Sequence, residues 1–176
     1  TIDELNALQR IMHKIASEYV TMYLRYDSEQ YKAFKIIELE NDKNYNLHFP
    51  IQVNGQTEQI NIYGIIDRVD EVMTLQGDIK TRIVDYKTGG DSVSFTNMDK
   101  VLSTNTSNKA LVQTLFYSYV FEQVTGRKAL EPHLYVARKM REEGTLFAGS
   151  YGKVMEKEFL MEQKEKFVDF LRSTLE

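Results

Sequence analysis

The chain has 176 residues, of which 42% are hydrophobic and 27% are charged, and this composition is typical of one globular domain with a substantial core. Its net charge is -4. Because nucleic-acid-binding proteins usually carry a basic face, this charge counts mildly against that class. The absence of cysteine excludes disulfides, zinc–cysteine sites and an iron–sulfur cluster within this chain, and agrees with a cytoplasmic location. No apolar run is long enough to span a bilayer, so we expect no membrane partner.

The N-terminal segment is polar and acidic, and it does not resemble a signal peptide. It lacks an initiator Met, which indicates a piece of a longer protein without its N-terminal part. Apolar residues at spacings of three and four predict a helix over 3–25, with Thr1 and Glu4 as a capping box. The apolar stripe of this helix consists of Leu5, Leu8, Met12, Ile15, Tyr19 and Met22.

Strand patterns follow the first helix. Residues 31–40 are rich in aromatic and branched side chains, which predicts a strand. Asn54-Gly55 predicts a hairpin turn, and a long strand is expected over 57–72. A turn at 76–78 then leads to a further strand over 80–87, which the glycines after it end.

The second half of the chain is richer in helical patterns. Polar residues dominate 91–108, which predicts a loop. Helices are expected over 109–124 and 154–175, and short strands after Pro132 and over 146–151. The order of elements predicts a mixed α/β domain in which helices cover the faces of a mixed sheet led by antiparallel strands.

The strongest chemical signal is an acid and a lysine two residues apart. Asp85 and Lys87 stand at the C-terminal end of an apolar strand, and residues two apart on a strand point to the same face. Tyr86 points to the other face, but its backbone carbonyl stays near the edge and could face a metal. The alternative is a surface salt bridge between Asp85 and Lys87 without a catalytic role.

Asp67 adds a second carboxylate to this region. A hairpin centred near Gly77 would bring Asp67 opposite roughly Lys87, so that Asp67 and Asp85 lie on neighbouring strands. Two adjacent carboxylates repel unless a cation neutralises them, and oxygen ligands suit Mg²⁺ or Mn²⁺. Such a metal would polarise a phosphoryl oxygen, while Lys87 would stabilise charge during phosphodiester hydrolysis. Alternatively, Asp67, Arg68 and Asp70 form only a charged strand end.

Three segments resemble the PD-(D/E)XK nuclease superfamily, specifically its RecB/AddB-like exonuclease branch. They are GIIDRVD at 64–70, DYKTG at 85–89, and a Q-x-x-x-Y helix motif with Gln113 and Tyr117. The resemblance covers about residues 30–140 and implies a restriction-endonuclease-like core, expected here as a single domain over 1–176.

The resemblance also implies an activity. It implies an Mg²⁺- or Mn²⁺-dependent DNA nuclease, an exonuclease that acts on single strands or duplex ends, joined to a helicase domain or subunit for DNA repair or recombination. A non-catalytic DNA-binding or scaffolding module with an incomplete metal site is the alternative, and RNA as the substrate remains a third reading. An isolated piece of such a protein could be inactive.

Roles carried over from the family fall on matching positions. Asp67, Asp85 and the carbonyl of Tyr86 are implied metal ligands, and Lys87 is the implied catalytic lysine. Gln113 and Tyr117 are four apart on one helix face, which in the family lies beside the active site. That face is implied either to contact nucleic acid or to steady the core.

The family also has a histidine or glutamate on an early helix that completes the metal site. His13 is the histidine in the first predicted helix, and it is either a ligand or a flanking residue. The ligand could also lie in sequence outside this chain. Glu40 matches an acid that supports the site in the family, and Glu38 is the rival choice.

A basic cluster follows the strand that is expected after Pro132. It consists of Arg138, Lys139 and Arg141. These residues either follow the phosphates of a nucleic acid near the site or form a solvated strand end.

Overall fold

The computed structural model describes residues 5–40, 45–89, 98–103, 109–128, 130–138 and 157–175. Its helices are α1 (Ala7–Gln30), α2 (Met98–Leu102), α3 (Lys109–Thr125) and α5 (Lys157–Leu175). Its strands are β1 (Tyr31–Leu39), β2 (Tyr45–Val53), β3 (Gln56–Gly64), β4 (Arg68–Thr74), β5 (Ile79–Lys87) and β6 (Leu130–Val136). The strand expected over 146–151 lies outside the described residues, as do Thr1, Glu4, Lys139 and Arg141.

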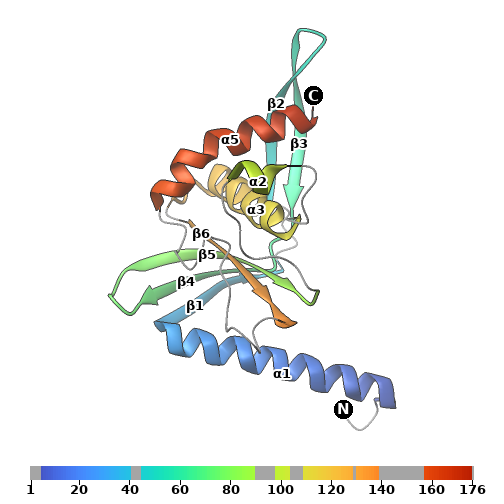
Figure 1. The fold of residues 1–176 in the computed structure, drawn as a ribbon, viewed down its shortest axis with the longest axis vertical. Coiled ribbons are helices and arrows are strands. Elements are labelled where there is room, and N and C mark those ends of the chain that lie inside the picture. Colours follow the sequence, from blue (N-terminus) through green and yellow to red (C-terminus); the bar gives the residue numbers. More distant parts are fainter. Residues whose placement is uncertain are drawn as a thin grey trace.

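Four strands form the main sheet in the order β1-β4-β5-β6. The first two neighbouring pairs are antiparallel, and β5 pairs with β6 in parallel. Helix α1 lies on one face of this sheet, whereas α3, α5 and the β2–β3 hairpin lie on the other (Figure 1). The expected mixed α/β domain, with helices on both faces of a mixed sheet, is therefore confirmed.

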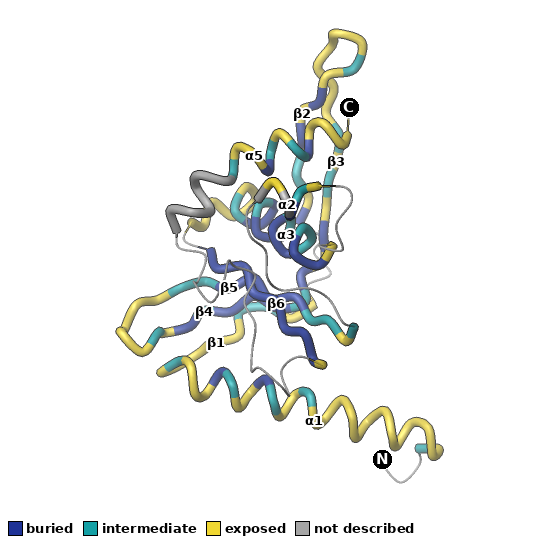
Figure 2. Tube along the Cα trace, viewed as in Figure 1, coloured by how far each residue is buried: buried dark blue, intermediate teal, exposed yellow. Residues whose placement is uncertain are grey.

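Helix α3 is central to the core on its face of the sheet. Leu111 and Leu115 of this helix pack in one cluster with Leu134 and Val136 of β6 and with Phe167 of α5. The tube in Figure 2 is darkest along the sheet and α3, which is where most buried residues lie. This packing fixes α3 beside the C-terminal ends of β5 and β6.

The two expected hairpin turns are present. Asn54 and Gly55 form a two-residue loop between β2 and β3, and both have positive φ, at 52° and 78°. Such values suit the turns that join tightly twisted hairpins. The turn between β4 and β5 contains Gly77, whose φ is 101°, a value that strains residues with a side chain.

The prediction of one long strand over 57–72 was wrong. Strand β3 ends at Gly64 and pairs with β2 in a separate two-stranded sheet, while β4 begins at Arg68 and pairs with β1 and β5. Between them, Ile65 is 49% exposed and Ile66 is only 2% exposed. The chain changes sheets at this link, and burial of the second isoleucine holds it in place.

The first helix also differs from the prediction. A capping box between Asn6 and Gln9 begins it, and it continues to Gln30. The apolar stripe is exposed in its first half, where Leu8 and Met12 are 66% and 61% accessible. The first half contains no buried residue, because only the second half of α1 packs on the sheet.

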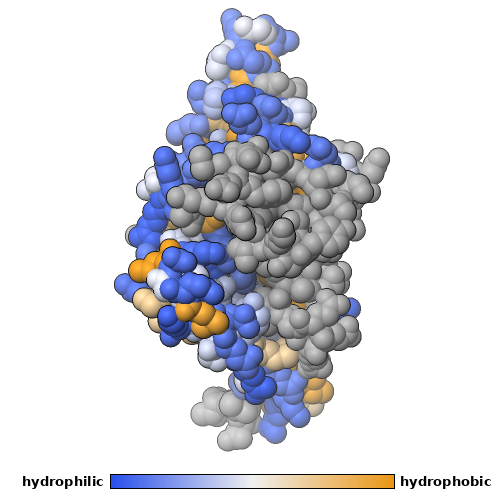
Figure 3. All heavy atoms as spheres, turned by 60° about the vertical axis from the view of Figure 1, so that its left-hand side comes forward, coloured by the Kyte–Doolittle hydropathy of each residue, from blue (hydrophilic) through white to orange (hydrophobic). Residues whose placement is uncertain are grey.

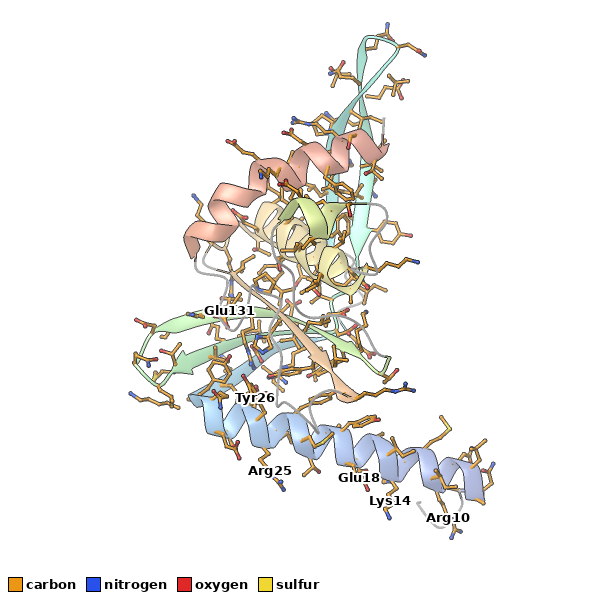
Figure 4. All side chains as sticks on the ribbon, viewed as in Figure 1. Arg10, Lys14, Glu18, Arg25, Tyr26 and Glu131 are labelled. Atoms are coloured by element: carbon orange, nitrogen blue, oxygen red, sulfur yellow. The ribbon has the colours of Figure 1, made fainter. Side chains whose placement is uncertain are left out.

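The side chains of α1 confirm this placement. Arg10, Lys14 and Arg25 extend from the side of α1 that faces away from the sheet, whereas Tyr26 extends toward it (Figure 4). The buried residues of α1 are Tyr23 and Asp27, both in the second half. The helix is therefore attached by aromatic and charged residues rather than by its aliphatic stripe.

Smaller differences concern the second half of the chain. Pro132 lies inside β6 rather than before it, which β6 tolerates because it is an edge strand of the described sheet. The short helix α2 falls within the expected loop 91–108. The coloured part of the face shown in Figure 3 is mainly hydrophilic, with apolar residues in small groups. None of the described helices has the length and apolar character needed to cross a membrane.

Candidate active site

The pair predicted from the D-x-K spacing is present at the end of β5. Asp85 is 1% exposed, and Nζ of Lys87 lies 2.8 Å from its Oδ2. Both side chains project from the same face of the sheet, as expected for residues two apart on a strand. The lysine side chain is 23% exposed, so the pair lies where the buried strand reaches solvent.

Asp67 lies in the link just before β4. The backbone N–H of Tyr86 donates a hydrogen bond of 2.8 Å to Oδ2 of Asp67, which joins the link to β5. Arg68 pairs with Val84, so continuing the register places Asp67 opposite Asp85 rather than opposite Lys87 as predicted. The shift of register therefore brings Asp67, at the end of the link, to the position beside Asp85 of β5.

A chain of hydrogen bonds connects this pair to α3. Nζ of Lys87 donates to Oε1 of Gln113 at 3.0 Å, and Nε2 of Gln113 donates to the hydroxyl of Tyr117 at 2.7 Å. The two residues of the Q-x-x-x-Y motif thus lie on one helix face beside the site. Gln113 orients the lysine, and Tyr117 orients the glutamine.

Tyr117 also contacts the link that carries Asp67. A Cβ added at Gly64 would lie 2.5 Å from Cε1 and 2.7 Å from Cδ1 of Tyr117. Glycine is required here by the close approach of the ring. The glycine of the GIIDRVD motif and the tyrosine of the helix motif are therefore packing partners.

The two candidate supporting acids lie at the end of β1. The backbone N–H of Glu40 donates a hydrogen bond of 2.9 Å to the carbonyl of Asp67. The φ of Glu40 is 40°, which lies outside the range of a strand, and its side chain is exposed. The carboxylate of Glu38 accepts a hydrogen bond from the hydroxyl of Tyr45. The backbone of Glu40 is therefore bonded to the link that carries Asp67, whereas the side chain of Glu38 is bonded to the first residue of β2.

His13 is not brought to this site. It lies in the exposed first half of α1, on the face of the sheet opposite to α3. Within the part of the chain that the structure describes, no group of three or more Asp, Glu, His or Cys side chains could hold a metal ion. The carboxylates of Asp67 and Asp85 are thus the acidic ligands that this part of the chain offers.

The donors that are present fit a hard divalent cation. They comprise the carboxylate of Asp67 in the link before β4, the carboxylate of Asp85 on β5, and the backbone carbonyl of Tyr86 between Asp85 and Lys87. All of these are oxygen ligands. Mg²⁺ and Mn²⁺ favour such ligands and usually keep several waters. Two protein carboxylates are therefore enough protein ligands of this kind for a Mg²⁺ site, because waters occupy the other coordination positions.

On the other side of the sheet lies a buried ionic network that was not predicted from the sequence. Asp27, Arg68, Asp70 and Arg82 are each 3% exposed or less, and each arginine forms salt bridges with both aspartates. Burial by itself would raise the pKa of Asp27, but the hydrogen bonds and charge of Arg82 lower this pKa overall. Two acids and two arginines balance in charge, which is what makes burial of the network tolerable.

The hairpin register that the structure shows, shifted from the predicted one, accounts for part of this network. Asp70 pairs with Arg82 across the same turn that places Asp67 opposite Asp85. An acid and an arginine facing each other within two apolar strands indicate an ion pair. Asp27 is 41 positions from Arg68 in sequence, and no local pattern predicts the contact between these two residues.

Comparison with known families agrees with this geometry. A model of the PD-(D/E)XK nuclease superfamily matches residues 2–174, nearly the whole chain. Neither a curated protein nor a solved structure matches the chain significantly. The mixed sheet with helices on its faces is consistent with the restriction-endonuclease-like fold of this superfamily. The chain therefore belongs to the PD-(D/E)XK nuclease superfamily.

Proposed function

We propose that the protein is a divalent-metal-dependent deoxyribonuclease whose active site consists of Asp67, Asp85 and Lys87. The observation that carries the proposal is the arrangement at the end of β5. Asp67, in the link directly before β4, is bonded to the backbone N–H of Tyr86 on β5, next to Asp85, and the lysine ammonium is 2.8 Å from the carboxylate of Asp85. A surface salt bridge alone does not require a buried aspartate, a second acid on the adjacent strand and a glutamine that orients the lysine.

Each residue then has a distinct task. Asp67 and Asp85, with the carbonyl of Tyr86, hold Mg²⁺ or Mn²⁺. When bound, this ion polarises the scissile phosphate and lowers the pKa of a nearby water. Lys87 places a positive charge where the attacking oxygen and the phosphate gain negative charge. Gln113 keeps that ammonium directed toward the site through its 3.0 Å hydrogen bond.

The substrate proposal combines the motifs with the surroundings of the site. The RecB/AddB-like motif order favours an exonuclease that acts on DNA ends and works with a helicase domain or subunit. Val136, the last residue of β6, pairs with Lys87, so Arg138 lies two residues beyond the end of this adjacent strand, and it is exposed. This arginine is placed to contact a phosphate of the bound strand.

A non-catalytic DNA-binding module is the second candidate. It is favoured by one observation, that the described residues bring together no third acidic or histidine ligand. In this reading the fold binds DNA or a helicase partner without cutting it. The two candidates differ in whether phosphodiester bonds break.

The test is cleavage of end-labelled DNA by the purified protein. Linear single-stranded DNA, linear duplex, closed circular duplex and RNA are each incubated with Mg²⁺, Mn²⁺ or a chelator. We expect metal-dependent loss of linear DNA, abolished by the chelator and by Asp85→Asn. Binding of DNA without cleavage in either metal would favour the second candidate, and cleavage of RNA alone would overturn the DNA assignment.

A further inference from the structure

The buried ionic network is closely bonded. Arg82 donates to Asp70 through Nε at 2.8 Å and Nη2 at 2.7 Å, and to Asp27 through Nη1 at 2.8 Å. Arg68 donates to Asp70 through Nε at 2.7 Å and to Asp27 through Nη2 at 2.8 Å. Each arginine therefore bridges both aspartates. The hydroxyl of Tyr135 adds a bond of 2.5 Å to Asp27.

The network lies on the opposite face of the sheet from the candidate active site. Side chains alternate along a strand, so Arg68 and Asp67 project to opposite faces. Tyr86, likewise, lies between Asp85 and Lys87 and projects away from them. Each residue of the candidate site is thus a sequence neighbour of a residue that the network holds from behind.

Tyr86 is the direct link between the two faces. Its hydroxyl accepts a hydrogen bond of 2.9 Å from Nη1 of Arg68, which crosses from β4 to β5. Its backbone N–H donates to Asp67 at 2.8 Å. Tyr86 is therefore held by two hydrogen bonds. Its side chain is bonded to Arg68, and its backbone is bonded to the carboxylate of Asp67.

Helix α1 supplies the anchor of this arrangement. Asp27 lies in the last turns of α1, where the helix dipole disfavours a negative charge. The carboxylate is nevertheless fully buried, because Arg68, Arg82 and Tyr135 all donate to it. It fixes the position of Arg68, and through Arg68 that of Tyr86.

We propose that Tyr86, Arg68 and Asp27 are positioning residues that set the separation of Asp67 and Asp85 and thereby the affinity of the site for a divalent cation. This inference rests on the proposed function of the same site. None of the three side chains needs to contact substrate or metal. Residues behind a metal site commonly act in this way, and their loss lowers metal affinity about 10–100-fold.

The sharpest variant is Tyr86→Phe, which removes one hydroxyl and leaves the ring and the backbone carbonyl in place. Tyr23→Phe is the matched control. The Tyr23 ring lies 5.1 Å from that of Tyr86, and the described hydrogen bonds of the network do not include its hydroxyl. Mn²⁺ is the probe, titrated into the full protein and followed by the electron paramagnetic resonance signal of the free ion.

We expect Tyr86→Phe to raise the dissociation constant for Mn²⁺ about tenfold, and Tyr23→Phe to leave it unchanged. The Mn²⁺ concentration for half-maximal cleavage should rise in parallel. A purely structural role would instead reduce the amount of folded protein and leave the midpoint of the Mn²⁺ titration unchanged. That outcome would overturn the proposal.

Variants of the anchor extend the test to α1. Asp27→Asn keeps the size of the side chain but weakens its bonds to both arginines, and it should raise the midpoint for Mn²⁺, whereas Asp27→Glu should restore part of the affinity. If the wild type binds Mn²⁺ and cuts DNA but Tyr86→Phe has wild-type affinity, the positioning role is wrong and the nuclease proposal stands. If the wild type neither binds Mn²⁺ nor cuts, the nuclease proposal itself fails, and the positioning role fails with it.

Discussion

The backbone N–H of Tyr86 donates a hydrogen bond of 2.8 Å to Oδ2 of Asp67. The bond fixes the carboxylate of the link before β4 against the strand that carries Asp85 and Lys87. A carboxylate held in this way through one oxygen keeps a constant orientation, which a metal ligand requires. The bond thus joins the two sequence motifs of the site, GIIDRVD and DYKTG, at Asp67 and Tyr86.

The first prediction concerns stabilisation by metal. A cation that binds only the folded protein stabilises it by about 2.7 kcal/mol at one hundred times its dissociation constant. For a chain of this length we expect Tm to rise by roughly 5–10 °C. Differential scanning calorimetry with and without Mn²⁺ measures this shift, and Asp67→Asn should abolish it, because the amide cannot replace the carboxylate charge.

Asp78→Asn is the control for that experiment. Asp78 is exposed and lies in the β4–β5 turn, away from the end of β5 that carries Asp85. This variant should keep the full shift in Tm. An equal shift in Asp67→Asn and in the wild type would show that the stabilising ion binds elsewhere.

The second prediction tests the packing of the helix motif on the link. Gly64→Ala places a Cβ 2.5 Å from Cε1 of Tyr117, so the ring or the link must move. We expect a loss of about 1–3 kcal/mol in the free energy of unfolding, measured by urea denaturation. Tyr117→Ala removes the obstacle, so the double variant should be more stable than the sum of the two single effects predicts. Additive losses would contradict this contact.

The third prediction concerns pH. His133 is 1% exposed, and burial, followed by the charge of Arg82, lowers its pKa well below the ordinary value. The unfolded chain takes up a proton at this histidine below about pH 6.5, while the folded chain does not. Stability should therefore fall as pH drops below about 6.5, by at most about 1.4 kcal/mol per pH unit from this residue.

His133→Phe isolates that contribution, because it keeps an aromatic ring and removes the titration. Urea denaturation at a series of pH values should show a flatter dependence for this variant. His48→Gln is the control, since His48 is exposed on β2 and its replacement should leave the slope as in the wild type. If His133→Phe and the wild type have the same slope, protonation of His133 does not limit acid stability.

The sequence predicted those features that depend on neighbouring residues. The hairpin at Asn54-Gly55 follows from the turn chemistry of that dipeptide, and the pairing of Asp85 with Lys87 follows from the two-residue repeat of a strand. The contact of Gln113 with Tyr117 follows from helical spacing. Each of these needs only a few consecutive residues.

Features that depend on distant parts of the chain were not predictable in the same way. The continuous strand pattern over 57–72 gave no sign of the change of sheet, because Ile65 and Ile66 are both good strand residues. The aliphatic stripe of α1 suggested packing through residues such as Leu8, but Asp27 makes the decisive contacts. Both outcomes depend on which elements meet in space, and residue periodicity does not contain that information.

The most direct test of the nuclease proposal is the rate of DNA cleavage at saturating Mg²⁺ or Mn²⁺ in two lysine variants of β5. Lys87→Ala removes the ammonium beside Asp85. Lys80→Ala is the control: it removes an ammonium at the other end of β5, 2.8 Å from a carboxylate oxygen of Glu131. Under single-turnover conditions we expect Lys87→Ala to cut at least about 100-fold more slowly than the wild type, and Lys80→Ala to cut at nearly the wild-type rate. Equal rates for Lys87→Ala and the wild type would contradict the account.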